Sequence, residues 1–199
     1  MKLNEKQNRD HIALIILIGS IGSFVISMGG FFLFPPTYVG EVPHYPVGLA
    51  YASEIGGALV LLATSLMAIR LADERQVLPA AGFTMMAIGQ GVFYVTIFEI
   101  FGEFTKEGLE KVLNIQIGGF ILCIPALFLI SFYTYFPRWL RWLTLFASIP
   151  YFICNVLIMV GNRNMELLDG FGAVGGVTLG VTQILWGVWM WKTRHHRQT

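Results

Sequence analysis

The stretch LAYASEIGGALVLLATSLMAIR, residues 49–70, has the length and the apolar composition of a membrane-spanning helix. About 20 mostly apolar residues are enough to cross the hydrocarbon core of a bilayer. Glu54 is the exception within the stretch, because an acidic side chain in a membrane interior costs about 2.5–3.5 kcal/mol on insertion scales. The stretch therefore predicts a membrane protein, and it raises the question of what Glu54 does there.

The rest of the chain repeats the apolar character of this stretch. Hydrophobic residues make up 55% of the 199 residues and charged residues only 13%, whereas a soluble domain carries about 25% charged residues. A globular core of this size cannot hide so much apolar surface, so lipid is the expected solvent. We predict one all-α integral membrane domain over residues 1–199, a bundle of six transmembrane helices at 12–34, 46–70, 77–101, 113–136, 139–161 and 167–191.

The distribution of basic residues predicts which side of the membrane the termini occupy. With the N-terminus in the cytoplasm, ten of the 13 lysines and arginines lie on the cytoplasmic side: Lys2, Lys6, Arg9, Arg70, Arg75, Arg138, Arg141, Lys192, Arg194 and Arg197. Cytoplasmic loops are enriched in Lys and Arg, so we expect both termini in the cytoplasm. The first apolar run is longer than the core of a cleaved signal, about 7–15 residues, and a bacterial plasma (inner) membrane is the expected location.

Several polar residues fall inside the predicted spans, and their depths can be compared. With a rise of about 1.5 Å per residue, Glu54, Tyr94 and Asn155 each lie about 6–7 Å outward of the middle of their helices. Gln90 and Tyr151 lie close to the membrane midplane. Tyr151 and Asn155 also share one helical face, because they are four residues apart. Hydrocarbon cannot satisfy hydrogen-bonding groups, so this face is expected to avoid lipid.

These polar residues lead to a binding hypothesis. We expect an outward-facing pocket among the second, third and fifth helices, with Glu54 as its charged or protonatable floor and with Tyr94, Asn155, Gln90 and Tyr151 along its walls. A carboxylate favours a cation, an amine or a proton as the ligand, whereas aromatic and aliphatic walls suit a lipid-like molecule. The alternative is structural: a protonated Glu54 would donate a hydrogen bond to Asn155 or to a backbone carbonyl and would join two helices.

The last predicted span carries a stripe of small residues. Gly172, Gly176 and Gly180 are spaced four residues apart, as in the GxxxG motifs through which membrane helices approach one another closely. Such a stripe serves either packing within the bundle or contact with a second copy or another membrane protein. The second function hypothesis follows from it: a non-catalytic membrane subunit, chaperone or regulator whose partner supplies the chemistry.

No residue pattern in the chain names a reaction. The sequence contains no HExxH, GxSxG or GxxxxGK[ST] motif, and Cys123 and Cys154 do not have the spacing of a zinc site. We therefore expect no metal site and no cofactor, and a non-enzymatic function is favoured over an enzymatic one. An intramembrane metal-dependent enzyme is the third hypothesis. The net charge of +1 gives no reason to expect a nucleic acid as a partner.

Overall fold

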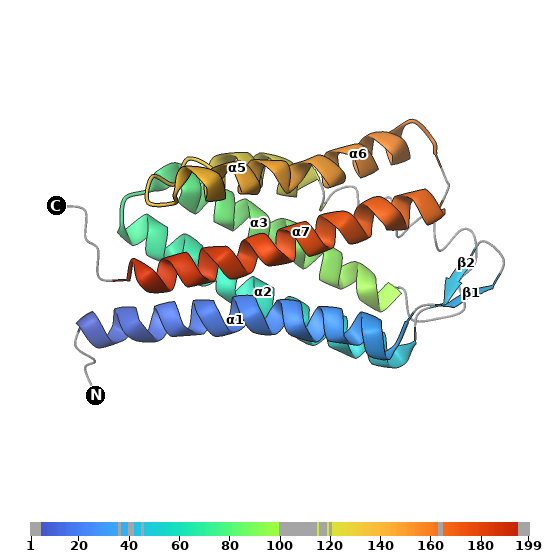
Figure 1. The fold of residues 1–199 in the computed structure, drawn as a ribbon, viewed down its shortest axis with the longest axis horizontal. Helices are drawn as coiled ribbons and strands as arrows, with labels where there is room; N and C mark the ends of the chain where they lie inside the picture. The colour runs from blue at the N-terminus through green and yellow to red at the C-terminus, as the bar shows by residue number, and fades with distance from the viewer. Residues whose placement is uncertain are drawn as a thin grey trace.

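The computed structural model describes the backbone of residues 5–35, 37–39, 42–44, 46–99, 115, 119, 121–162 and 165–194. The description includes their side chains, except at residues 5, 6, 38, 39, 42–44, 93–99, 165, 166 and 169. These residues form an all-helical bundle with one short two-stranded ribbon (Figure 1). Both chain termini lie at one end of the bundle and the ribbon lies at the other (Figure 1). We call the half of the bundle at the end with the termini the inner half, and the half at the end with the ribbon the outer half.

Six labelled helices and the ribbon make up the described elements. The helices are α1 (Glu5–Leu33), α2 (Val47–Asp73), α3 (Val77–Glu99), α5 (Arg138–Phe146), α6 (Ser148–Met159) and α7 (Met165–Lys192). A further apolar helix covers Ile121–Ile130. The strands β1 (Thr37–Val39) and β2 (Val42–His44) pair antiparallel, with Tyr38 opposite Pro43.

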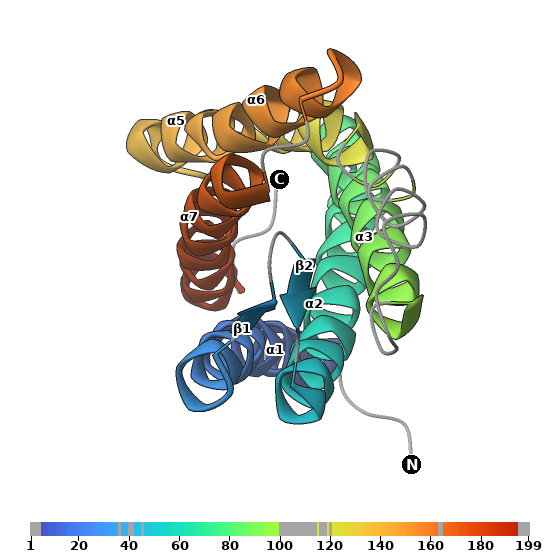
Figure 2. The same ribbon diagram turned by 90° about the vertical axis from the view of Figure 1, so that its right-hand side faces the viewer.

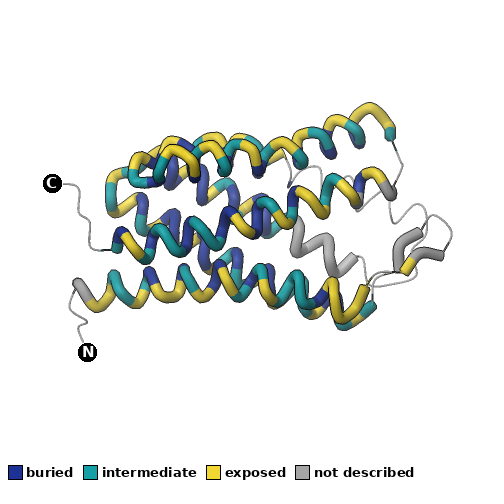
Figure 3. The backbone as a smooth tube through the Cα atoms, in the orientation of Figure 1, coloured by how far each residue is buried: buried dark blue, intermediate teal, exposed yellow. Residues whose placement is uncertain are grey.

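Four helices of the described part are long and apolar enough to cross a membrane. They are Gln7–Leu33, Val47–Asp73, Arg138–Met159 and Gly170–Lys192. Large apolar side chains such as Ile18, Ile69 and Phe152 are exposed on the outward faces of these helices, while buried residues face inward (Figure 3). Soluble monomers rarely expose apolar surface on this scale, so the surface agrees with a membrane protein.

The helices follow one another around the bundle in chain order, as the view along its axis shows (Figure 2). Consecutive packing joins α1 to α2 and α2 to α3, and α7 closes the arrangement by packing on both α6 and α1. The helix Ile121–Ile130 packs closely on α3, because a Cβ at Gly82 would lie 2.8 Å from the Ala126 carbonyl oxygen. Small residues thus allow close contact at several helix pairs, as expected where lipid supplies no hydrophobic driving force between helices.

The predicted span 139–161 is not one regular helix, because it is interrupted at Ala147 between α5 and α6. Pro150 explains the interruption, since proline has no N–H to donate to the Phe146 carbonyl and its ring clashes with that carbonyl. Ala147 keeps right-handed helical angles (φ −62°, ψ −19°). The two helices therefore still form one apolar stretch from Arg138 to Met159.

The predicted span 113–136 ends earlier than expected, since the helix stops at Ile130 and a turn leads to α5. The Ser131 hydroxyl donates to the Phe128 carbonyl (2.6 Å). The Arg141 guanidinium donates to the Ser131 carbonyl (2.8 Å). These bonds satisfy carbonyls that a continued helix would use, so the last six predicted residues form a turn. Most of residues 113–120 lie outside the described residues.

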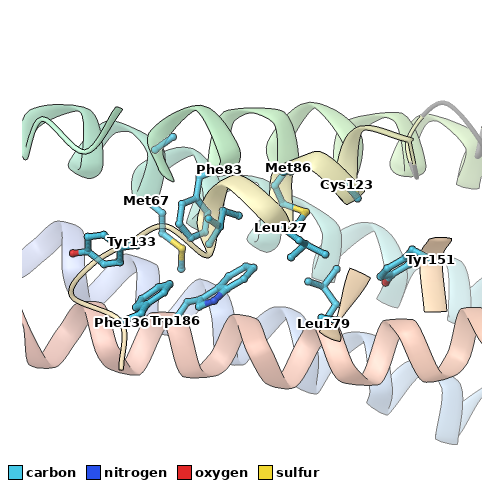
Figure 4. Packing of buried hydrophobic residues seen from close by; sticks show 14 of the residues in the cluster. Met67, Phe83, Met86, Cys123, Leu127, Tyr133, Phe136, Tyr151, Leu179 and Trp186 are labelled. Atoms are coloured by element: carbon cyan, nitrogen blue, oxygen red, sulfur yellow. The ribbon is translucent and has the colours of Figure 1, made fainter. Parts of the chain in front are cut away.

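Bulky apolar side chains fill the inner half of the bundle (Figure 4). Trp186 of α7 is fully buried and meets Phe83 of α3 edge to face, with ring centroids 5.1 Å apart. Its indole N–H donates to the Thr144 hydroxyl (3.0 Å), which ties α7 to α5. Met67 of α2 lies beside the same pair. Three-way packing of this kind seals the centre of the inner half.

A polar clamp closes the inner end around Arg70 of α2. Its guanidinium donates to the Glu74 carboxylate (2.8 Å), to the Met190 carbonyl (2.6 Å) and to the Thr193 carbonyl (3.1 Å). The Tyr133 hydroxyl donates to the other Glu74 oxygen (3.1 Å). Burial, together with the neighbouring Glu74 carboxylate, raises the pKa of Tyr133. The clamp thereby joins α2, the 131–137 turn and the C-terminal end of α7, whose last carbonyls a cation stabilises.

Candidate functional site

Asn155 is the most informative polar residue of the outer half. It lies on α6, on the buried face that also carries Tyr151, Cys154 and Ile158, and its exposed fraction is only 3%. Within the part of the chain that the structure describes, neither the amide nitrogen nor the amide oxygen of its side chain has a hydrogen-bond partner. Leaving a buried polar group unpaired costs about 1–3 kcal/mol. A fold that keeps both atoms unpaired therefore points to a role for this amide outside the fold itself.

The contacts of two glycines give the register between neighbouring helices near the middle of the bundle. Gly187 of α7 faces Ser20 of α1, because a Cβ at Gly187 would lie 3.0 Å from the Ser20 hydroxyl oxygen. Gly22 of α1 faces Leu59 of α2 in the same way, at 3.1 Å. Ser20, Gly187 and Leu59 therefore lie at nearly one level.

A layer of polar side chains crosses the bundle at this level. A Cβ at Gly91 of α3 would lie 4.0 Å from a methyl group of Leu61 in α2. Gln90 is next to Gly91 in sequence and Leu59 is two residues from Leu61, so Gln90 and Leu59 lie at similar depth in the bundle. Gln183 lies one turn of α7 outward of the contact with Ser20. We call Ser20, Gln90 and Gln183 the polar layer; they come from α1, α3 and α7.

Two members of the polar layer also carry unpaired atoms. Ser20 is 1% exposed and Gln183 is 5% exposed, and neither the Ser20 hydroxyl nor the Gln183 amide nitrogen has a hydrogen-bond partner. The amide nitrogen of Gln90 contacts the Met86 sulfur at 3.8 Å, a weak acceptor. Sequence analysis did not select Ser20 or Gln183; the only signal is that Gln183 is an amide inside an apolar helix between two glycines.

Glu54 does not lie beside Asn155. Glu54 is half-buried and precedes Leu61 by seven residues, so the two share one face of α2. Leu61 lies near Gly91 of α3. We therefore infer that Glu54 lies on the side of α2 that faces α3, which we call the α2–α3 seam. Helix α6 packs on α5 and α7, and it lies across the bundle from α2 (Figure 2). Within the described part of the chain, Glu54 makes no hydrogen bond or ion pair. The Glu54–Asn155 hydrogen bond of the structural alternative is therefore not formed.

The two predicted tyrosines differ in what the structure describes. Tyr151 is buried on α6 and lies against α7, because a Cβ at Gly175 would lie 3.2 Å from its ring. Tyr94 lies on α3 one turn outward of Gln90, and its side chain is outside the described residues. Tyr151, Asn155 and Gln90 thus have buried side chains inside the bundle, while Glu54 lies at its flank.

The three glycines of the predicted stripe have different surroundings. A Cβ at Gly180 would collide with the ring of Phe24 in α1, so Gly180 permits close packing. A Cβ at Gly172 or at Gly176 would meet no atom within 4 Å. Helices α1 and α7 diverge toward the outer end (Figure 1), which explains why the stripe packs at one residue and is open at the other two.

The described residues contain no group of three or more His, Cys, Asp or Glu side chains that could hold a metal ion. Cys123 and Cys154 are free thiols, and both are buried. The side chain of His44 is outside the described residues. The buried candidate residues with described side chains offer amides (Asn155, Gln90, Gln183), a hydroxyl (Ser20) and a phenol ring (Tyr151).

The chain matches no protein-family model, no curated protein and no solved structure. Similarity therefore assigns neither a family nor a function. The fold and the site define an all-helical protein with four helices that are apolar enough to span a membrane and with unpaired amide groups buried between them.

Proposed function

We propose that the chain is a six-span membrane protein that binds or transports a small ligand in an outward-facing site within the outer half of its bundle. The positive-inside distribution of Lys and Arg supports cytoplasmic termini, which makes the inner half cytoplasmic. The shorter apolar helices Val77–Val92 and Ile121–Ile130 are proposed to belong to the two remaining spans. A bacterial plasma membrane remains the proposed location.

The unpaired side chain of Asn155 is the observation that carries this proposal. It offers one hydrogen-bond donor and one acceptor, both buried and both unused by the protein. Gly175 of α7 faces Tyr151, so Asn155, one turn further outward on α6, lies at the level of Gly172. A Cβ at Gly172 or at Gly176 would meet no atom within 4 Å, so α7 leaves space close to the level of Asn155. A ligand in this space would pair with Asn155.

The inner half supports an outward-facing rather than an inward-facing site. The Trp186–Phe83 pair is closely packed, and the clamp around Arg70 joins α2 to α7 at the inner end. Neither feature has a counterpart among the described residues of the outer half. A ligand would therefore enter from outside, and transport would require the Trp186–Phe83 packing to open.

We centre the site on Asn155 rather than on Glu54. Tyr151 and Gln90 are proposed to line the deeper part of the site, because both are buried inside the bundle. Tyr94 is proposed to line it from α3. Glu54 is proposed to lie beside the site, toward α3, rather than at its floor.

Native mass spectrometry of the gently solubilised chain tests the proposal. The wild type is expected to carry a small adduct, and Asn155→Leu is expected to lose it, because leucine has a similar branched shape and no hydrogen-bonding atoms. Asn8→Leu is the matched control, since Asn8 is exposed at the start of α1 and the adduct should persist. An adduct retained by Asn155→Leu, or no adduct on the wild type, would overturn the proposed site.

A second candidate function has one observation in its favour. Gly172 and Gly176 have open space around them, and small residues on an unpacked helix face suit contact with another membrane helix. The chain would then be a non-catalytic subunit, chaperone or regulator, or it would form homo-oligomers. Gly176→Leu would dissociate a complex that co-purifies with the wild type, and Asn155→Leu would leave that complex intact.

A further inference from the structure

We propose that the site accepts uncharged molecules with a hydrogen-bonding polar group, such as a carboxamide, a urea or an alcohol, and rejects cations and anions. This inference rests on the proposed function, because it names the ligand class of the same site. It differs from the expectation of a cation or an amine, which depended on Glu54 as the floor of the pocket.

The buried polar residues of the described part carry no charge. Ten polar residues are buried in the described part of the chain, and none of them is ionisable: Ser20, Ser23, Thr64, Gln90, Ser131, Thr144, Asn155, Thr182, Gln183 and Thr193. Taking an ion out of water is costly unless an opposite charge or several hydrogen bonds compensate it. Glu54 is half-buried and lies on α2, which is across the bundle from α6, the helix that carries Asn155. A charged ligand would find no buried counter-ion among the described side chains.

Several buried polar atoms of the described part have no hydrogen-bond partner. The amide of Asn155 leaves both a donor and an acceptor unpaired, Gln183 leaves a donor, and Ser20 leaves a hydroxyl that can do either. A ligand with only apolar atoms would leave all of these groups unsatisfied. A neutral group that both donates and accepts matches them, because an amide pairs with an amide in both directions.

The unpaired groups lie at two different depths along the bundle. Asn155 lies at the level of Gly172, near the outer end, and Gln183 lies about 17 Å deeper along α7, at 1.5 Å per residue. Gly176 lies between them, on the face of α7 that also carries Leu179 and Gln183, because residues three and seven apart share a face. Phe24 covers Gly180 just outward of Gln183. A ligand would meet Asn155 first and the polar layer second.

Cysteine labelling at Gly176 tests the charge preference on the full chain in detergent. Gly176→Cys is expected to fold, since a Cβ there meets no atom within 4 Å; Gly172→Cys is a second variant with the same property. Val47→Cys is the exposed control, and the wild type is the blank because both of its cysteines are buried. The probes are methanethiosulfonates with a hydroxyethyl, a trimethylammonioethyl or a sulfonatoethyl group.

The expected result is a change in the ratio of rates. The hydroxyethyl reagent should outpace each charged reagent at Gly176→Cys by about tenfold more than it does at Val47→Cys, because only the charged reagents lose hydration without compensation. Equal ratios at the two cysteines would overturn the inference and leave the site standing. No labelling at Gly176→Cys or Gly172→Cys, with normal labelling at Val47→Cys, would overturn the proposed function as well.

A second comparison tests the hydrogen-bonding part. Ethyl methanethiosulfonate is neutral but has no hydroxyl, so its rate at Gly176→Cys is the reference for the hydroxyethyl reagent. The preference for the hydroxyethyl reagent should fall severalfold when Asn155→Leu is added. An unchanged preference would show that Asn155 does not recognise the polar group, and it would overturn this part of the inference.

Discussion

The polar groups around Arg70 and Trp186 in the inner half differ in their hydrogen bonding from Asn155 in the outer half. In the inner half, Arg70 binds one carboxylate and two carbonyls, and the Trp186 indole binds Thr144. In the outer half, both amide atoms of Asn155 are buried and unpaired. The same contrast holds for packing, since large rings fill the inner half while Gly172 and Gly176 meet no atom within 4 Å.

This difference separates groups that stabilise the fold from groups that do not. A paired, buried side chain contributes to stability, whereas an unpaired one costs stability. We infer that the inner half holds the helices together and seals one side, and that the outer half is built to receive a ligand. Substitutions in the two halves should therefore have opposite consequences.

The largest effect is expected from Trp186→Ala in the inner half. Removing a fully buried tryptophan leaves a cavity and costs about 3–5 kcal/mol, and it also leaves the Thr144 hydroxyl without its donor. Thermal unfolding in detergent should show a large drop in midpoint. The control is Trp142→Ala, because Trp142 is exposed. Similar midpoints for the two variants would contradict the sealing role of Trp186.

Arg70→Met should have the next largest effect. The substitution keeps much of the side-chain volume but leaves the largely covered Glu74 carboxylate without its cation, at a cost of about 3 kcal/mol. The matched control is Arg75→Met, since Arg75 is exposed in the following turn. Limited proteolysis should show faster cleavage at the C-terminal end of α7 for Arg70→Met only. Equal cleavage of both variants would mean that the clamp does not hold α7.

Two glycines of one stripe sharpen the comparison at smaller magnitude. Gly180→Ala forces a methyl group against the Phe24 ring and should cost about 1–3 kcal/mol. Gly176→Ala meets open space and should stabilise the helix by up to about 1 kcal/mol. Opposite shifts in thermal midpoint are expected, and equal shifts would contradict the divergence of α1 from α7.

The smallest effect at neutral pH concerns Tyr133. Its pKa is raised in the folded chain by burial and by Glu74, above the unfolded value of about 10. The stabilisation is therefore complete below about pH 10 and is lost as the pH rises above it. Unfolding midpoints from about pH 8 to 11 should fall more for the wild type than for Tyr133→Phe. Parallel curves would remove Tyr133 from the clamp.

Much of the fold and part of the site could be predicted from sequence, because apolar length and helical spacing are local properties. The polar face of α6 indicated Tyr151 and Asn155, and both are buried there. The depth of Glu54 was also predicted from its position, but depth does not say which helices are neighbours. Because the helices follow chain order around the bundle, α2 and α6 lie across from one another, and Glu54 does not meet Asn155.

The glycine stripe shows the same limit. Gly172, Gly176 and Gly180 have equal spacing, yet only Gly180 packs on α1. Their difference arises from the angle between α1 and α7, which no spacing in the sequence reveals. Ser20 and Gln183 were not predicted as site residues for a related reason, since only the register between α1 and α7 brings them within about one helical turn of each other.

The most direct test of this account is the stability of Asn155→Leu, measured by thermal unfolding of the purified chain without added ligand. If Asn155 serves a ligand and not the fold, the substitution removes two unpaired polar atoms and the variant should be at least as stable as the wild type. A loss of about 2 kcal/mol or more would contradict the account, because it would show that the Asn155 amide stabilises the bundle itself.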